Sequence, residues 1–97
     1  MTNENKEIER LRLEIARNEN ELASMKQITS GMDKERALRH GAAVTDLEFK
    51  LQDAKLHLNT LLDASRESRQ EELRGTRQML SDLTREMEQA RIQMEAG

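Results

Sequence analysis

Hydrophobic residues recur at alternating steps of three and four along the first part of the chain. Such spacing forms the a/d stripe through which helices meet in coiled coils. The stripe consists of Ile8, Leu11, Ile15, Asn18, Leu22 and Met25. It predicts an N-terminal coiled-coil helix within residues 1–30, beginning near residue 4. Asn18 is the polar member of the stripe, and it either sets the register and number of the helices or lies at an exposed point.

The pattern fails over residues 31–42. Gly31 and Gly41 bracket this stretch, and each glycine is about 1 kcal/mol less favourable than alanine within a helix. The stretch is therefore predicted to be a connection. Thr45 and Glu48 then have the spacing of a capping box, in which both side chains satisfy free N–H groups at a helix start. A second helix is expected to begin near residue 43.

A second stripe follows this connection and is interrupted once. It comprises Val44, Leu47, Leu51, Ala54, Leu58 and Leu61, and it returns after a polar gap as Leu73, Thr76, Leu80, Leu83, Met87, Ala90 and Met94. Because residues 63–72 contain no glycine or proline, one long helix over residues 43–97 is favoured, with a phase shift near residues 62–72. The alternative is a turn in the gap, with Ser68 and Glu71 forming the capping box of a third helix.

These elements predict an all-α, elongated coiled coil. A helical hairpin of residues 4–30 and 43–95 is the favoured arrangement. The shorter first helix would leave the stripe from Leu73 to Met94 without a partner in its own chain, and such a helix is marginal alone. The hairpin is therefore expected to self-associate. A three-helix bundle, in which this stripe folds back, and a parallel coiled coil are the alternatives.

Composition agrees with narrow seams between helices. The chain has 97 residues, of which 36% are charged, with Phe49 as its single aromatic residue and no proline. Aromatic side chains normally supply much of the volume of a broad core. The net charge is −3 without a basic block, so no nucleic-acid partner is expected.

The chain also lacks the signals of membrane insertion and secretion. No apolar run approaches the roughly 20 residues of a membrane span, and no secretory signal is expected at the start of the sequence. The absence of cysteine favours an intracellular, cytoplasmic setting.

No constellation of side chains suggests catalysis. His40 and His57 have no cysteine or second histidine near them in the sequence, so neither a metal site nor a cofactor is expected. The serines likewise lack a histidine and an acid at useful positions. The chain is predicted not to be an enzyme.

The predicted site is instead an interaction seam. Methionine packs adaptably, so the methionines near the end of this seam are expected to form core, with a docking face for a partner helix as the alternative. The seam comprises Ile8, Leu11, Ile15, Leu22, Met25, Val44, Leu47, Leu51, Leu58, Leu73, Leu80, Leu83, Met87 and Met94.

One family resemblance covers about residues 8–62. The segments Leu11–Leu22 and Leu47–Leu58 resemble the two helices of the REM (homology region one) repeat, the antiparallel coiled-coil finger of Rho effectors. Asn18 and Glu19 stand where that family usually has a Gly-Ala step. The resemblance implies binding of a GTP-loaded Rho-family protein along the hairpin, and it assigns no individual contact residue.

Two functions are therefore expected. The first is a non-enzymatic scaffold that self-associates and tethers other proteins through its helices. The second is a recognition module for a small GTPase.

Overall fold

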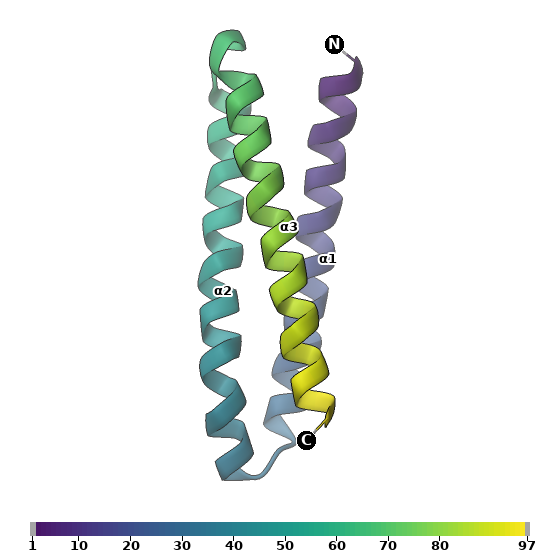
Figure 1. The fold of residues 1–97 in the computed structure, drawn as a ribbon, viewed down its shortest axis with the longest axis vertical. Coiled ribbons are helices and arrows are strands. Elements are labelled where there is room, and N and C mark those ends of the chain that lie inside the picture. The colour runs from purple at the N-terminus through teal and green to yellow at the C-terminus, as the bar shows by residue number, and fades with distance from the viewer. Residues whose placement is uncertain (1, 97) are drawn as a thin grey trace.

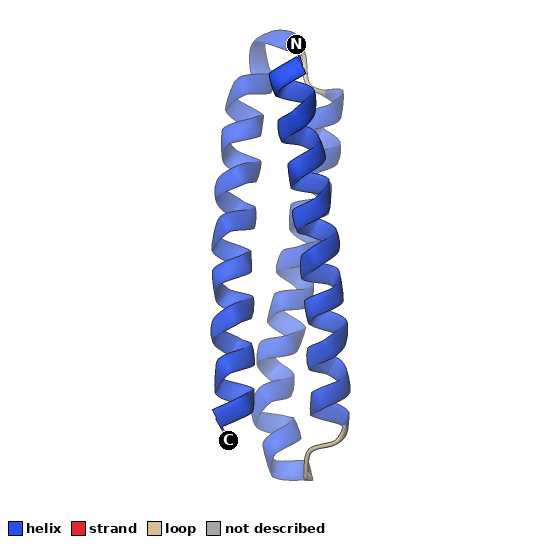
Figure 2. Ribbon diagram, turned by 90° about the vertical axis from the view of Figure 1, so that its right-hand side faces the viewer, coloured by secondary structure: helices blue, strands red, loops and turns tan. Residues whose placement is uncertain are grey.

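The computed structural model describes residues 2–96 of the chain. It contains three helices in this range, α1 (Thr2–Ser30), α2 (Lys34–Asp63) and α3 (Arg66–Ala96). They lie side by side, α2 runs opposite to α1 and α3 (Figures 1 and 2), and each helix contacts the other two. The particle measures 50 × 18 × 16 Å. The predicted all-α, elongated architecture is confirmed.

The first turn is much shorter than the predicted connection over residues 31–42. The helix α2 begins at Lys34, because Asp33 caps it: the Asp33 carboxylate accepts a hydrogen bond from the Arg36 backbone N–H at 2.9 Å. An aspartate in this position satisfies one of the free donors of the first helical turn. The predicted helix start near residue 43 is therefore wrong, and Gly41 lies inside α2.

The second turn interrupts the helix predicted over residues 43–97. Ala64 is extended, with φ −69° and ψ 148°, and its N–H bonds to the Leu61 carbonyl at 3.2 Å. The Ser65 hydroxyl then accepts a bond from the Ser68 N–H at 3.4 Å, as a serine before a helix commonly does. The polar gap near residues 62–72 is thus a turn followed by the first turns of α3, and the capping residue is Ser65 rather than Ser68.

A single core runs between the three helices. Its buried apolar residues are Leu11, Ile15, Leu22, Met25, Val44, Leu47, Leu51, Ala54, Leu58, Leu61, Leu73, Leu80, Leu83, Met87 and Met94. Because α3 turns back along α1 and α2, its stripe of leucine and methionine is covered by its own chain. Packing of this stripe explains why a break forms without glycine or proline, since burial contributes more to helix stability than intrinsic propensity does.

Candidate functional site

The predicted interaction seam lies inside the fold. All its members are buried except Ile8, which is partly buried and packs against the core. The structure brings residues from all three helices together, with Met25, Leu80 and Met87 among the most deeply enclosed. These side chains hold the helices against one another and are not available on the surface to a partner.

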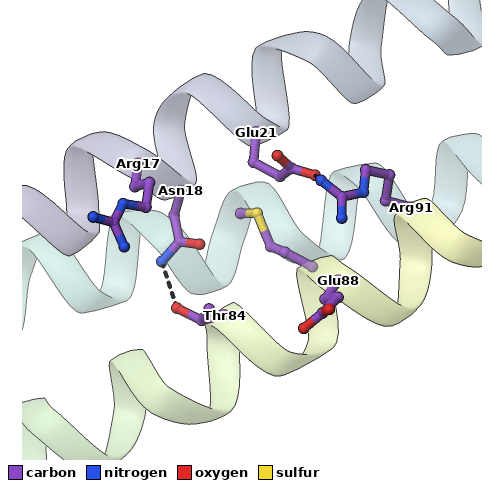
Figure 3. A pocket seen from close by; sticks show the side chains of 7 residues that line it. Arg17, Asn18, Glu21, Thr84, Glu88 and Arg91 are labelled. Carbon is purple, nitrogen blue, oxygen red and sulfur yellow. Dashed lines mark hydrogen bonds and ion pairs between the residues drawn. The ribbon is translucent and has the colours of Figure 1, made fainter.

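A polar layer interrupts this core between α1 and α3. Asn18 is 4% exposed, and its amide nitrogen donates to the Thr84 hydroxyl at 3.1 Å. That hydroxyl donates in turn to the Glu14 carboxylate at 3.0 Å. Figure 3 shows Asn18 directed at Thr84 across a shallow hollow of about 160 Å³. Of the two interpretations of Asn18, burial in the seam is therefore the one observed.

Charges around the hollow are balanced. Arg91 forms an ion pair with Glu21 at 2.8 Å, and these two side chains lie together at one end of the view in Figure 3. Arg17 and Glu88 complete the charged lining. With two cations and two anions around an open depression, the hollow has no excess charge with which to hold an ionic ligand.

Ion pairs between helices agree with the directions and register of the helices. Lys26 pairs with Glu48 and Lys55 with Glu19 across α1 and α2, and the two residue numbers add to 74 in both pairs, as antiparallel helices in one register require. Between α1 and α3, which run the same way, the pairs include Arg69 with Glu4 and Arg77 with Glu7. The pairing of opposite charges beside the seams is typical of e and g positions.

Lys50 is the titratable group with the clearest perturbation. It lies between α2 and α3, where its ammonium contacts both Glu86 and Asp46. The hydrogen bond to Glu86, followed by that to Asp46, raises the pKa of Lys50 above its ordinary value of 10.5. A lysine held protonated in this way acts as a structural cation and is unsuited to nucleophilic chemistry.

The histidines do not converge with other ligands. His57 Nε2 lies 4.0 Å from an Asp53 carboxylate oxygen on the next turn of α2. Over residues 2–96, no group of three or more His, Asp or Glu side chains is arranged to hold a metal ion. Within the same described part, no helix is long and apolar enough to cross a membrane.

The surface feature that stands out is an apolar stripe on the outward face of α2. Three of its side chains are large and well exposed: Leu38 at 72%, Phe49 at 71% and Leu56 at 63%. Three smaller or polar exposed residues lie between them, and the six positions together follow one another at alternating steps of four and three. None of the six is charged. We call this the outer stripe, and it consists of Leu38, Ala42, Thr45, Phe49, Gln52 and Leu56.

The outer stripe lies opposite the core-facing side of α2. At 3.6 residues per turn, its positions point roughly 180° away from Val44, Leu47 and Leu51, which are buried. Helix α2 is therefore amphipathic on two opposite faces. Sequence reasoning missed this site because it followed one stripe per helix, although the spacing of Leu38, Phe49 and Leu56 is visible in the sequence.

The other helices do not repeat this feature. On α1, the large exposed apolar side chains are Leu13 at 63% and, near the end of the helix, Ile28 at 36%, and the outward-facing Ala16 and Ala23 between them are small. On α3, Ile92 is exposed at 55%, with the charged residues Glu88 and Glu95 at neighbouring positions. The outer stripe is therefore specific to α2 among the described helices.

In comparisons with known proteins, no family model, no curated protein and no solved structure matches this chain.

Proposed function

We propose that this chain is a non-enzymatic interaction and tethering protein, which folds as a three-helix bundle and binds other protein through the outer stripe of α2. In this proposal the bundle replaces the hairpin first expected from the sequence. The long seam maintains the fold, and the outer stripe provides the contact with a partner.

The observation that supports the proposal is that α2 has apolar residues on two opposite faces, one buried and one exposed. A surface helix needs one apolar face to pack on its own core. Leu38, Phe49 and Leu56 are extra to that need, since they are exposed on the opposite face. Aligned, exposed apolar residues mark interaction sites more often than isolated ones do, and apolar positions at steps of three and four suit a partner helix.

Photo-cross-linking tests the proposal directly. A photoreactive residue would replace Gln52 in the outer stripe or, as the control, the exposed Ser81 on α3, and the chain would be irradiated in its native cells. We expect discrete cross-linked proteins from position 52 and none of these from position 81. The products should disappear when Phe49→Lys is added. Products that are equal at both positions, or that survive Phe49→Lys, would overturn the proposal.

A second candidate is binding of a Rho-family GTPase by α1 and α2. It is supported by the antiparallel contact of these helices over the segments that resemble the Rho-effector finger. The chain should then bind a GTP-loaded member of the family more tightly than the GDP-loaded form. Equal or absent binding of both forms across a panel of Rho-family proteins would eliminate this candidate.

A further inference from the structure

We propose that the partner bound by the outer stripe is a second copy of this chain, docked antiparallel across a twofold axis that passes near Leu47. This inference rests on the proposed function and narrows it to one partner. It follows from the charges on the two sides of the stripe, and the spacing and size of the stripe are compatible with it.

The outer stripe has the same spacing when it is followed in either direction from Leu47. Leu38 and Leu56 each stand nine residues from Leu47, and the inner members are arranged in the same way. Two antiparallel copies of α2 can therefore bring every stripe position opposite a stripe position of the other copy. The opposed pairs are Leu38 with Leu56, Ala42 with Gln52, and Thr45 with Phe49.

In the heptad of the outer stripe, the a positions are Ala42, Phe49 and Leu56, and the d positions are Leu38, Thr45 and Gln52. Each opposed pair therefore joins an a residue of one copy to a d residue of the other, as in antiparallel coiled coils. Each layer joins a larger side chain to a smaller one, except at the two ends, where leucines meet. The Phe49 rings of the two copies lie close to the axis, one on either side. A twofold arrangement also uses the same surface on both chains and leaves no open end, so it stops at a dimer.

The flanking charges favour the antiparallel direction. On the side of the stripe towards α3, Arg39 of one copy faces Asp53 of the other, and the axis repeats this pair. Arg39 has no ion pair with another residue of the described part, and Asp53 approaches only His57 there. Both charges are therefore available to a second chain.

The acidic residues next to the axis are already neutralised. Asp46 and Glu48 would each approach their own copy across the twofold axis, which places like charges together. However, Lys50 lies 3.1 Å from Asp46, and Lys26 lies 2.6 Å from Glu48, within each chain. These lysines reduce the repulsion that the two carboxylates would otherwise cause.

A parallel pair would place like charges together. In a parallel coiled coil, a g residue faces the e residue five positions later on the other chain. Relative to the outer stripe, Lys34 and Glu48 are g residues, and Arg39 and Asp53 are e residues. Lys34 would then face Arg39 on both sides of the dimer. Glu48 would face Asp53, although Lys26 reduces the charge of Glu48 in this case as well. The Lys34–Arg39 repulsion does not occur in the antiparallel arrangement, which instead places Arg39 opposite Asp53 on both sides of the axis.

The size of the stripe predicts a weak dimer. From Leu38 to Leu56 it extends about 28 Å at 1.5 Å per residue, with three large apolar side chains on each copy. This interface falls at the small end of specific protein contacts, where association is transient. The dimer is therefore expected to form only at high concentrations of the chain.

Sedimentation equilibrium of the whole chain from about 5 to 500 µM tests the association. We expect a monomer–dimer equilibrium that Phe49→Lys weakens at least tenfold. Ile92→Lys is the matched control, because Ile92 is also a large exposed side chain, at 55%, but lies on α3. It should leave the dissociation constant unchanged, and circular dichroism checks that both variants remain helical. A wild-type chain that stays monomeric, or equal effects of both variants, would overturn the inference.

Cysteine cross-linking tests the direction, since the chain has no cysteine of its own. Ala42→Cys and Gln52→Cys are prepared as separate proteins and oxidised alone or mixed. The antiparallel dimer predicts a disulfide in the mixture and little in either protein alone. Efficient cross-linking of Ala42→Cys with itself would instead show a parallel pair and contradict the proposal.

A charge exchange tests the flanking contact. Arg39→Asp and Asp53→Arg should each weaken the dimer several-fold, and the double variant should restore it. Failure of the double variant to recover affinity would overturn the assigned register. If photo-cross-linking from position 52 captured other proteins but never a second copy, the homodimer would fail while the proposed function would stand.

Discussion

Replacing the buried Asn18 with leucine should stabilise the protein. The Asn18 amide makes one hydrogen bond, to Thr84 at 3.1 Å, and a typical bond of this kind contributes about 1 kcal/mol net. Thr84 is exposed and keeps its bond to Glu14, so loss of the amide does not isolate it. A buried leucine gains about 2 kcal/mol over an exposed one, and the hollow of about 160 Å³ beside Asn18 offers room for it. The expected net gain is about 1 kcal/mol.

Urea unfolding followed by circular dichroism measures this gain as a shift of the midpoint at constant slope. The melting temperature should rise by roughly 4–8 °C for a domain of this size. Asn18→Ala should instead cost about 1–2 kcal/mol, because it loses the bond and leaves space unfilled. Asn20→Leu is the control at an exposed position of α1, and only a few tenths of a kcal/mol from helix propensity are expected there.

A double-mutant cycle separates the hydrogen bond from packing. Asn18→Ala combined with Thr84→Val should reveal a coupling energy of about 0.5–1.5 kcal/mol. In the Asn18→Leu background, where this bond is already absent, Thr84→Val should lower stability by less than it does in the wild type, and the difference should equal the coupling energy. The reasoning would be refuted if Asn18→Leu destabilised the chain by more than about 1 kcal/mol, since the polar layer would then contribute more than its single bond accounts for.

Three further predictions concern the core, one glycine and one lysine. Leu80→Ala, at a fully buried position, should lower the free energy of unfolding by about 2–5 kcal/mol, whereas Leu13→Ala at an exposed position should change it by under about 0.5 kcal/mol in urea titrations. Gly75→Ala should raise it by about 1 kcal/mol in the same assay, because an added Cβ meets nothing within 4 Å and alanine favours the helix; a loss would mean that the site is more crowded than it appears. The pKa of Lys50 is raised above 10.5 by its bonds to Glu86 and Asp46, so its contribution is complete below pH 10.5 and is lost as pH rises through the higher folded value. The difference in melting temperature between wild type and Lys50→Met should therefore shrink in alkaline buffer above that pH, and a difference that grows there would contradict the sign.

The sequence predicted the helical class and the buried seam better than it predicted the number and the ends of the helices. The all-α, elongated fold follows from the heptad spacing, and the seam residues follow from the same rule. Gly41 was misleading as a boundary, because a glycine costs only about 1 kcal/mol in a helix and α2 continues through it. The cap at Asp33 lay in a stretch whose apolar pattern was weak.

The break at Ala64 was the larger difference, and local sequence could not decide it. No glycine or proline interrupts the polar gap, so local signals allowed both a helix and a turn. The long stripe from Leu73 to Met94 gains burial when α3 folds back, and that energy depends on contacts with α1 and α2. The outer stripe, in contrast, was predictable, since a second set of heptad steps through Phe49 is present in the sequence itself.

The central claim is that the stripe from Leu73 to Met94 is covered by its own chain, which leaves the outer stripe of α2 for partners. Small-angle scattering with mass determination on the double variant Phe49→Lys, Leu56→Lys tests it most directly. We expect a folded monomer of 11.2 kDa with a radius of gyration near 15.5 Å at every concentration. A stable oligomer, or a clearly longer particle, would instead show that α3 packs against another chain and that its stripe is not covered within one molecule.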